Sequence, residues 1–232
     1  SHDDLSIVKN FSTLISRGDR IGILGPNGVG KSTLIQLLLK KLKPDEGRIE
    51  HGTKLDVAYY DQLRTELDPQ KSVRDNLAEG RDMLEVAGKA KHVMSYLNDF
   101  LFASQRANSP VSSLSGGERN RLMLAKLFAK PFNLLLMDEP TNHLDIDSRE
   151  ALTAAINAYQ GAVILVTHDL HLVELCADQL WIARNGSCQP FDGDIDDYRK
   201  EILESRRADK RREKVEKSGN GDDRSSKREA RR

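Results

Sequence analysis

The chain has 232 residues, 38% hydrophobic and 31% charged, a composition typical of a soluble globular protein rather than a disordered or membrane-embedded one. It contains no apolar run near the roughly 20 residues that a membrane span needs and no signal peptide, so we expect a cytoplasmic protein. Its two cysteines lie in unrelated surroundings and support neither a disulfide framework nor a thiolate metal site. Residues 199–232 carry 14 Lys and Arg against 8 Asp and Glu, so a net charge of +6 there leaves −6 on the remainder of the neutral chain.

The first elements that the sequence predicts are two short strands, at Leu5–Val8 and Thr13–Ile15. Their abrupt start leads us to expect that the chain is a fragment of a longer protein. The apolar run Arg20–Leu24 then predicts a buried strand, and Leu34–Lys43 predicts a helix.

Between this strand and this helix lies a stretch with the spacing G-x-x-x-x-G-K-[ST] of a phosphate-binding loop. The nine residues of the stretch are Gly25, Pro26, Asn27, Gly28, Val29, Gly30, Lys31, Ser32 and Thr33. Backbone N–H groups of such a loop and the start of the helix can hold a polyphosphate, while Lys31 reaches its outer phosphates and Ser32 ligates Mg²⁺. The alternative is a glycine-rich turn without function, but the flanking strand and helix favour the phosphate-binding loop.

The next segment predicts a hairpin or two neighbouring strands, at Arg48–Glu50 and Leu55–Tyr60. Gln62 follows the second strand, where it can contact Mg²⁺ or orient water, although a solvated surface residue is the alternative. From Val73 to about Leu101 the apolar residues have helical spacing without an alternating strand pattern. This stretch therefore predicts an inserted α-helical subdomain.

A helix over Asn120–Lys130 follows the sequence Leu-Ser-Gly-Gly-Glu at 114–118. Ser115 and Glu118 have the spacing of a capping box, which would make the motif purely structural. Alternatively, Gly116 and Gly117 expose backbone N–H groups at the helix start to a second anion.

Acidic side chains end the apolar strand predicted at Asn133–Met137. Asp138 can hold Mg²⁺ through water, and Glu139 can position or polarise an attacking water. A second apolar strand, Ala162–Val166, ends beside His168, which we expect within range of a γ-phosphate because ligands bind at the carboxyl ends of parallel strands.

The remaining elements predicted for the body are helices at Ile146–Tyr159 and Leu170–Cys176 and a hairpin of Gln179–Ala183 and Ser187–Phe191. Asn185-Gly186 would form its turn and Trp181 would pack in the core. The tail is helical in composition from Ile195 to Glu216 and carries charges of both signs. We expect it either to bind RNA or DNA by charge alone or to be one solvated arm of a coiled coil.

Taken together, the phosphate loop, Gln62, the stretch at 114–118, the Asp138-Glu139 strand end and His168 resemble the ordered motifs of an ATP-binding cassette (ABC) ATPase. Asp138-Glu-Pro-Thr-Asn-His-Leu-Asp145 resembles the ABC-F class, whose members are soluble and carry two cassettes in one chain. The resemblance implies an α/β P-loop NTPase cassette with a mostly parallel core sheet, an antiparallel N-terminal β-subdomain and the helical insert at about 65–130. The cassette would occupy residues 1–192, and residues 193–232 would be a charged helical tail, the truncated start of a coiled coil, as at the end of a second cassette.

The same resemblance implies a function and a set of roles. ATP would be hydrolysed with Mg²⁺, held by Ser32, Gln62 and Asp138, and the catalytic residues would be Glu139, His168 and Gln62. In such a family Ser115, Gly116 and Gly117 close over the γ-phosphate held by another cassette. Glu118 of the same motif and Asp145 of the D-loop would also belong to the nucleotide-binding residues. The second cassette would come from the full-length chain or from a homodimer.

Partners implied by the ABC-F class are the ribosome, with its rRNA and tRNA, or DNA. The first alternative is the nucleotide-binding subunit of a membrane transporter. The second is a nucleic-acid-binding module or DNA-associated ATPase in which ATP is only a switch.

Overall fold

The computed structural model describes residues 8, 9, 11–60, 67–86, 88–142, 144–184 and 186–204. The chain divides into two compact units, residues 1–191 and residues 192–232. Within the described ranges, every helix is too short or too polar to cross a bilayer.

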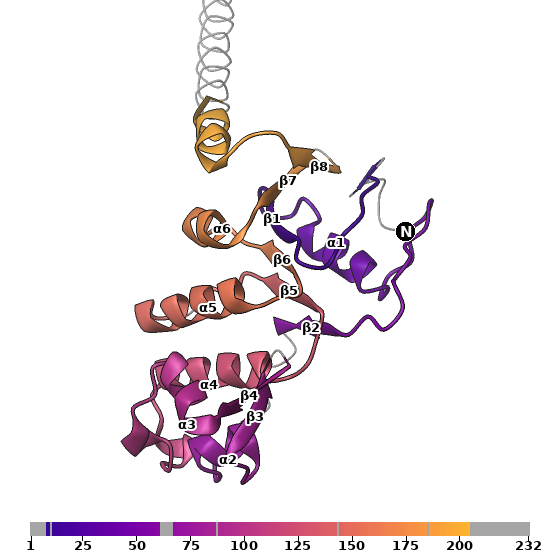
Figure 1. The fold of residues 1–232 in the computed structure, drawn as a ribbon. Coiled ribbons are helices and arrows are strands. Elements are labelled where there is room, and N and C mark those ends of the chain that lie inside the picture. Colours follow the sequence, from indigo (N-terminus) through magenta and orange to yellow (C-terminus); the bar gives the residue numbers. More distant parts are fainter. Residues whose placement is uncertain are drawn as a thin grey trace, which may run out of the picture. The chain divides into compact units, whose positions relative to one another are not determined.

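A six-stranded sheet forms the centre of the first unit (Figure 1). Its strands, in spatial order, are β2 (Val57–Tyr59), β5 (Leu134–Asp138), β6 (Ala162–Val166), β1 (Arg20–Leu24), β7 (Gln179–Arg184) and β8 (Ser187–Phe191). Neighbouring strands pair in parallel except for β7 and β8, which form the expected antiparallel hairpin. The predicted α/β fold with a mostly parallel sheet is thus confirmed.

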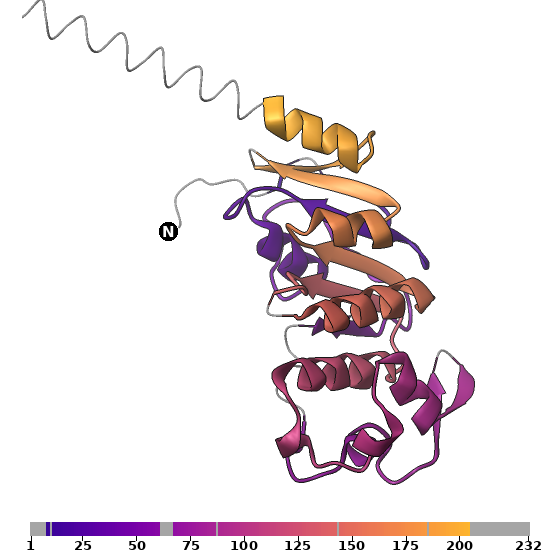
Figure 2. The ribbon, with the colours of Figure 1, turned by 90° about the vertical axis from the view of Figure 1, so that its left-hand side faces the viewer.

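Helices cover both faces of this sheet, α1 on one face and α5 and α6 on the other (Figures 1 and 2). They are α1 (Lys31–Leu38), α5 (Ile146–Ala158) and α6 (Leu170–Cys176). Side chains alternate between the two faces of a strand, and β5 shows the result. Leu134 and Leu136 lie in the buried cluster that includes α1, whereas Leu135 and Met137 lie in the cluster that includes α5 and α6. A fully apolar strand is therefore buried on both sides.

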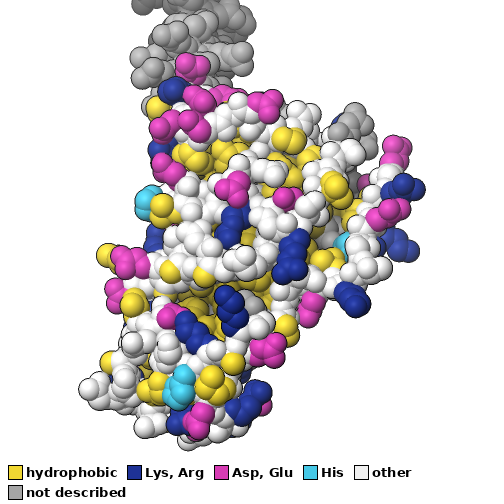
Figure 3. Space-filling model, in the orientation of Figure 1, with side chains coloured by type: hydrophobic (Ala, Val, Ile, Leu, Met, Phe, Trp, Pro, Cys, Tyr) yellow, Lys and Arg dark blue, Asp and Glu magenta, His cyan; other side chains and the backbone are white. Residues whose placement is uncertain are grey.

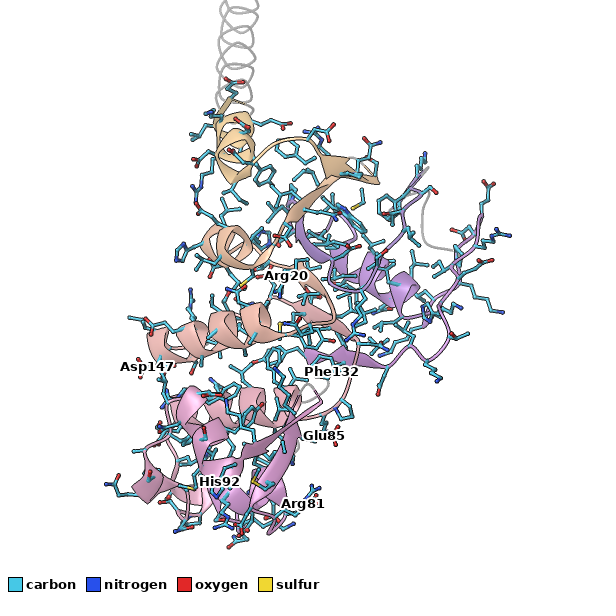
Figure 4. The ribbon with its side chains drawn as sticks, viewed as in Figure 1. Arg20, Arg81, Glu85, His92, Phe132 and Asp147 are labelled. Atoms are coloured by element: carbon cyan, nitrogen blue, oxygen red, sulfur yellow. The ribbon has the colours of Figure 1, made fainter. Side chains whose placement is uncertain are left out.

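Arg20, at the start of β1, connects the sheet to the end of α5 through hydrogen bonds (Figure 4). Its guanidinium donates to the carbonyl oxygens of Ile156, at 2.7 Å, and Tyr159, at 2.8 Å. The Ile156 carbonyl also accepts from the N–H of Tyr159 at 3.1 Å, and a cation at a helix C-terminus interacts favourably with the helix dipole.

The helical insert follows β2 and is built mainly from short helices. It contains α2 (Val73–Ala78), β3 (Met83–Val86), β4 (Lys89–His92), α3 (Val93–Asp99), the 3₁₀ helices η2 (Ser104–Arg106) and η3 (Val111–Ser113), and α4 (Gly116–Phe128). The prediction of continuous helical spacing from 73 to 101 was wrong in its middle, where β3 and β4 pair in an antiparallel hairpin. Gly88, with φ of +76°, lies in the turn between them. The hairpin side of the insert carries Glu85 and His92 (Figure 4).

The N-terminal part departs from the expected antiparallel β-subdomain. Thr13–Ile15 and Arg48–Glu50 form no strand, while the segment at Leu5–Val8 lies outside the described residues except for its last residue. The strand predicted at Leu55–Tyr60 exists as β2, but it pairs in parallel with β5. The Asn133 side chain stabilises this pairing, because it accepts from the N–H of Asp56 at 2.9 Å and donates to the carbonyl of Lys54 at 2.7 Å.

The second unit is described only at its start, where residues 195–204 are helical. Asp194 accepts a hydrogen bond from the N–H of Asp197 at 2.9 Å and so caps the first turn. Arg199 and Lys200 each pair with an aspartate three residues earlier. The rest of the predicted tail helix, and hence its proposed coiled coil, lies outside the described residues.

Candidate functional site

The phosphate loop connects β1 to α1 and depends on glycine at three places. A Cβ on Gly25 would overlap the backbone carbonyl of Ala183 in β7, so no larger residue fits there. Gly28 and Gly30 have φ values of +81° and +96°, in the left-handed region that favours glycine, and Gly30 is the N-cap of α1. The sequence spacing therefore corresponds to a curled loop that ends at a helix N-terminus.

Lys31 lies inside this loop and is only 8% exposed. Its Nζ donates to the carbonyl oxygens of Gly25 and Pro26 at 2.7 and 2.8 Å, which holds the ammonium group at the mouth of the loop. Burial lowers the pKa of Lys31, and the nearby carboxylates of Glu139 and Asp138 oppose this effect in part. A buried ammonium group gains more from a bound anion than an exposed one does, because its own hydration has already been lost.

Ser32 and Asp138 face each other across the start of α1 and the end of β5. The Ser32 hydroxyl donates to Asp138 Oδ2 at 2.8 Å. A hydroxyl and a carboxylate are oxygen ligands of the kind that Mg²⁺ takes in nucleotide sites, where it retains several waters. The chemistry of this donor set, beside a loop that holds a buried lysine, fits a magnesium–triphosphate group. The third residue predicted for the metal, Gln62, lies outside the described residues.

Glu139 directly follows β5 and has a φ of +48°, an unusual value for a residue other than glycine. Its N–H donates to the carbonyl of Val166 at 2.7 Å, and its Oε2 lies 3.4 Å from both the Thr167 hydroxyl and the N–H of His168. The other oxygen, Oε1, is buried and has no hydrogen-bond partner within the described ranges. Strained backbone and a buried unpaired carboxylate oxygen are both more frequent at functional sites than elsewhere.

His168 brings the three segments together at the carboxyl ends of β5 and β6. Its Nε2 lies 2.5 Å from Asn27 Oδ1, 3.4 Å from Glu139 Oε1 and 3.5 Å from Lys31 Nζ. His168 Nε2 and Glu139 Oε1 are not aligned as a hydrogen bond, so Oε1 has no hydrogen-bond partner among the described residues. The loop, the strand-end carboxylates and the histidine, predicted separately, thus form one cluster.

The motif at 115–118 forms a second group, at the start of α4. The predicted capping box is confirmed, because Ser115 Oγ accepts from the N–H of Glu118 and Glu118 Oε2 accepts from the N–H of Ser115. Arg106 donates twice to the same carboxylate, at 2.8 and 2.7 Å. This pair, with the bonds to Ser115, lowers the pKa of Glu118 to about 2.

Asp145 joins this second group from the segment that follows Glu139. It caps α5 by accepting from the N–H of Ser148 at 2.9 Å, and its carboxylate lies directly against Gly117. The guanidinium of Arg121 lies 3.8 Å from Asp145 and 3.7 Å from Asp147, whose position at the start of α5 is labelled in Figure 4. Among the described residues, no hydrogen bond or ion pair joins positions 115–118 to the phosphate loop.

Three site residues escaped the sequence analysis: Arg106, Arg149 and Thr167. Thr167 follows β6 directly and could have been found by its place next to His168. Arg149 on α5 reaches Asp169 Oδ2 at 3.1 Å and the carbonyls of Thr141 and Leu144, both at 3.4 Å. Neither arginine belongs to a sequence pattern, since its contacts exist only once the chain is folded.

Comparisons with known proteins agree with this geometry. The sequence model of the family described as "ABC transporter" matches residues 8–142. The chain is 56% identical over 180 residues to the ATP-binding protein Uup of Escherichia coli (strain K12), an alignment that covers 78% of this chain and 28% of that protein. It is 50% identical over 177 residues to Uup of Haemophilus influenzae (strain ATCC 51907 / DSM 11121 / KW20 / Rd), covering 76% and 27%.

A solved structure extends the likeness to the fold. The archaeal ribosome recycling factor aABCE1, determined in complex with the ribosomal stalk protein aP1, superposes with a TM-score of 0.58 at 25% identity and covers 81% of this chain. The chain covers 38% of that structure and less than a third of the two sequence relatives.

Proposed function

Because the chain belongs to the ABC transporter family, and within it to the ABC-F class, we propose that the cluster around Lys31 and Glu139 is one half of an ATP-hydrolysing site. The observation that carries this proposal is the convergence of a phosphate loop, an oxygen donor pair and a buried carboxylate with one unpaired oxygen. The cleavage of a phosphoanhydride at such a site divides into three tasks.

The first task is binding, which we assign to residues 25–33. The backbone N–H groups of the loop and of the first turn of α1 surround the triphosphate, and Lys31 exchanges the loop carbonyls for phosphate oxygens. Ser32 and Asp138, with Gln62, would hold Mg²⁺, which when bound neutralises part of the charge that develops on the phosphates.

The second task is activation of water, which we assign to Glu139. Its unpaired Oε1 is the acceptor that an attacking water would use, and Thr167 together with the N–H of His168 fixes the other oxygen. His168 Nε2 lies within 3.5 Å of both Lys31 and Glu139, so it is placed to donate to the γ-phosphate when it gives up its contact with Asn27 Oδ1. These are the parts of general base catalysis with electrostatic stabilisation.

The third task requires a second cassette. Residues 115–118 and Asp145 lie apart from the phosphate loop within one chain, so we propose that Ser115, Gly116 and Gly117 contact the nucleotide held by another copy or by another cassette of the same protein. Phosphate release per molecule should then rise with protein concentration, and Lys31→Ala should abolish it. Mixing Glu139→Gln with Ser115→Arg chains should restore part of the activity, because one composite site of the mixed pair keeps both intact halves. Activity that is independent of concentration in a monomeric protein would contradict the composite site.

We propose that ATP turnover is coupled to work on the ribosome, in the cytoplasm. The support is the ABC-F class and the likeness to a ribosome recycling factor that binds a ribosomal stalk protein. Co-sedimentation decides between this and the two alternatives. With MgATP, the Glu139→Gln chain should pellet with ribosomes, whereas a transporter subunit would follow the membrane fraction and a DNA-associated ATPase would bind duplex DNA.

A further inference from the structure

Arg106 and Glu118 form a bidentate ion pair beside the first turn of α4. Arg106 Nε donates to Oε1 at 2.8 Å and Nη2 donates to Oε2 at 2.7 Å, so both carboxylate oxygens are engaged. The pair joins η2 to α4 across a separation of 12 residues. Such parallel bonds fix the direction of a carboxylate as well as its charge.

The backbone around Arg106 is itself fixed. Its N–H donates to the carbonyl of Ala103 at 2.9 Å, and its own carbonyl accepts from the N–H of Ser109 at 3.0 Å. Glu118 is held from the other side by the N–H of Ser115 at 2.9 Å. Three donors, two from Arg106 and the N–H of Ser115, therefore fix the orientation of the Glu118 carboxylate at the start of α4.

A negative charge at this place conflicts with the function proposed above. The N–H groups of Gly116 and Gly117 belong to the first turn of α4, where a helix offers donors and positive potential to an anion. Glu118 belongs to the same turn, and a free carboxylate there would repel a triphosphate. Phosphates can therefore bind at this helix start only if a cation close to Glu118 offsets its charge.

We propose that Arg106 is a positioning residue of the ATPase: it neutralises Glu118 and holds this carboxylate against η2, so that the first turn of α4 can accept the phosphates of a nucleotide held by a second cassette. This inference rests on the proposed function. Within the described ranges, the neighbouring arginines are otherwise engaged, since Arg119 donates to the carbonyl of Ser112 at 3.0 Å and Arg121 lies near Asp145 and Asp147. Arg106 is thus the side chain that carries the neutralising charge.

A double-mutant cycle tests the proposal on the 232-residue chain. Arg106→Gln should raise the apparent KM for MgATP in phosphate release by about tenfold, because the uncompensated carboxylate weakens closure on the nucleotide. In a Glu118→Gln background, the same change should have less than about a twofold effect, because no charge remains to be neutralised. Arg74→Gln is the matched control, since it breaks another arginine–carboxylate pair of the insert, with Asp82, and should leave KM unchanged.

Two further readouts separate this role from a merely structural one. The defect of Arg106→Gln should shrink when the salt concentration is raised from about 0.05 to 0.5 M, because salt screens the repulsion between Glu118 and the phosphates. Thermal melting identifies any variant that is partly unfolded, and Arg106→Lys, which keeps the charge, should then retain a KM closer to that of the unmodified chain. An equal effect of Arg106→Gln in both backgrounds, or no effect in either, would overturn the inference. The proposed function is judged separately, by whether phosphate release from the unmodified chain is lost in Lys31→Ala.

Discussion

Gly117 and Asp145 are in such close contact that a Cβ on the glycine would overlap the aspartate carboxylate. Gly117 belongs to the first turn of α4, and Asp145 caps α5 in the segment that leaves Glu139. The hydroxyl of Ser148 also reaches the carbonyl of Gly117, at 3.3 Å. The starts of two helices, one from the insert and one from the sheet core, are thus fixed to each other at the place where we propose that a second cassette docks.

This contact predicts the effect of Gly117→Ala. Within a helix, alanine is favoured over glycine by about 1 kcal/mol, so propensity alone would stabilise the variant. Because the added methyl group must displace Asp145, we expect phosphate release to fall by at least about tenfold instead. Gly52→Ala is the control, since a Cβ there meets nothing within 4 Å and its backbone is ordinary. Turnover equal to that of the control would show that the contact has no part in hydrolysis.

Arg149 connects the segment after Glu139 to the segment after His168. Its guanidinium reaches Asp169 and the carbonyls of Thr141 and Leu144. Arg149→Gln should loosen both segments and lower kcat by about threefold to tenfold, while the Kd for ATP stays within about twofold because no phosphate contact is lost. Calorimetry and phosphate release measure the two quantities, and Glu150→Gln, on the exposed face of the same helix, is the control. A change in Kd alone would contradict this assignment.

The Arg106–Glu118 pair should also affect stability as a function of pH. The pKa of Glu118 is lowered from 4.5 to about 2, chiefly by the bond from Arg106. A carboxylate with a lowered pKa stabilises the fold fully above its ordinary pKa, and this contribution is lost as the pH falls from 4.5 toward 2. The melting temperature of the unmodified chain should therefore exceed that of Arg106→Gln near neutral pH, and the difference should narrow below pH 4.5. A difference that stays constant with pH would show that Glu118 has an ordinary pKa.

The sequence was sufficient to predict the cluster at the sheet edge, because each part has its own local signal. The loop spacing, the acids after one apolar strand and the histidine after another all point to the carboxyl ends of parallel strands, where the structure places them. Local sequence patterns did not predict the elements whose structure depends on contacts between residues far apart in the sequence. Leu84 is buried in the insert core while its neighbours in β3 are exposed or half-buried, a pattern too short to distinguish from a helical face.

Contacts made by long side chains could not be predicted from the sequence either. Arg106 lies 12 residues from Glu118, and Arg149 lies 20 residues from Asp169, so no periodicity connects either pair. The strand predicted at Leu55–Tyr60 was expected in a hairpin or beside a neighbouring strand at Arg48–Glu50, because its true partner, β5, is distant in the sequence. Nothing in the sequence predicts that the Asn133 side chain bonds to the backbone just before β2.

The basic tail should bind nucleic acid through charge. The face of the first unit seen in Figure 3 carries Lys and Arg side chains intermingled with Asp and Glu, so it offers no continuous basic surface. Residues 199–232 have a net charge of +6 and no aromatic side chain that could stack on bases. Their affinity for duplex DNA and ribosomal RNA should fall steeply with salt, with a log–log slope of about −0.9 per phosphate contacted on a duplex. If deletion of these residues leaves the affinities and salt slopes unchanged, the tail has a structural role instead.

Phosphate release from MgATP by the Glu139→Gln chain, compared with the unmodified chain at the same concentration, tests the central claim most directly. The substitution keeps the shape of the side chain and removes its ability to accept a proton, so we expect ATP to bind with unchanged affinity while turnover falls by at least about a hundredfold. Turnover within about twofold of the unmodified chain, in a preparation whose activity is lost in Lys31→Ala, would show that Glu139 does not activate the water.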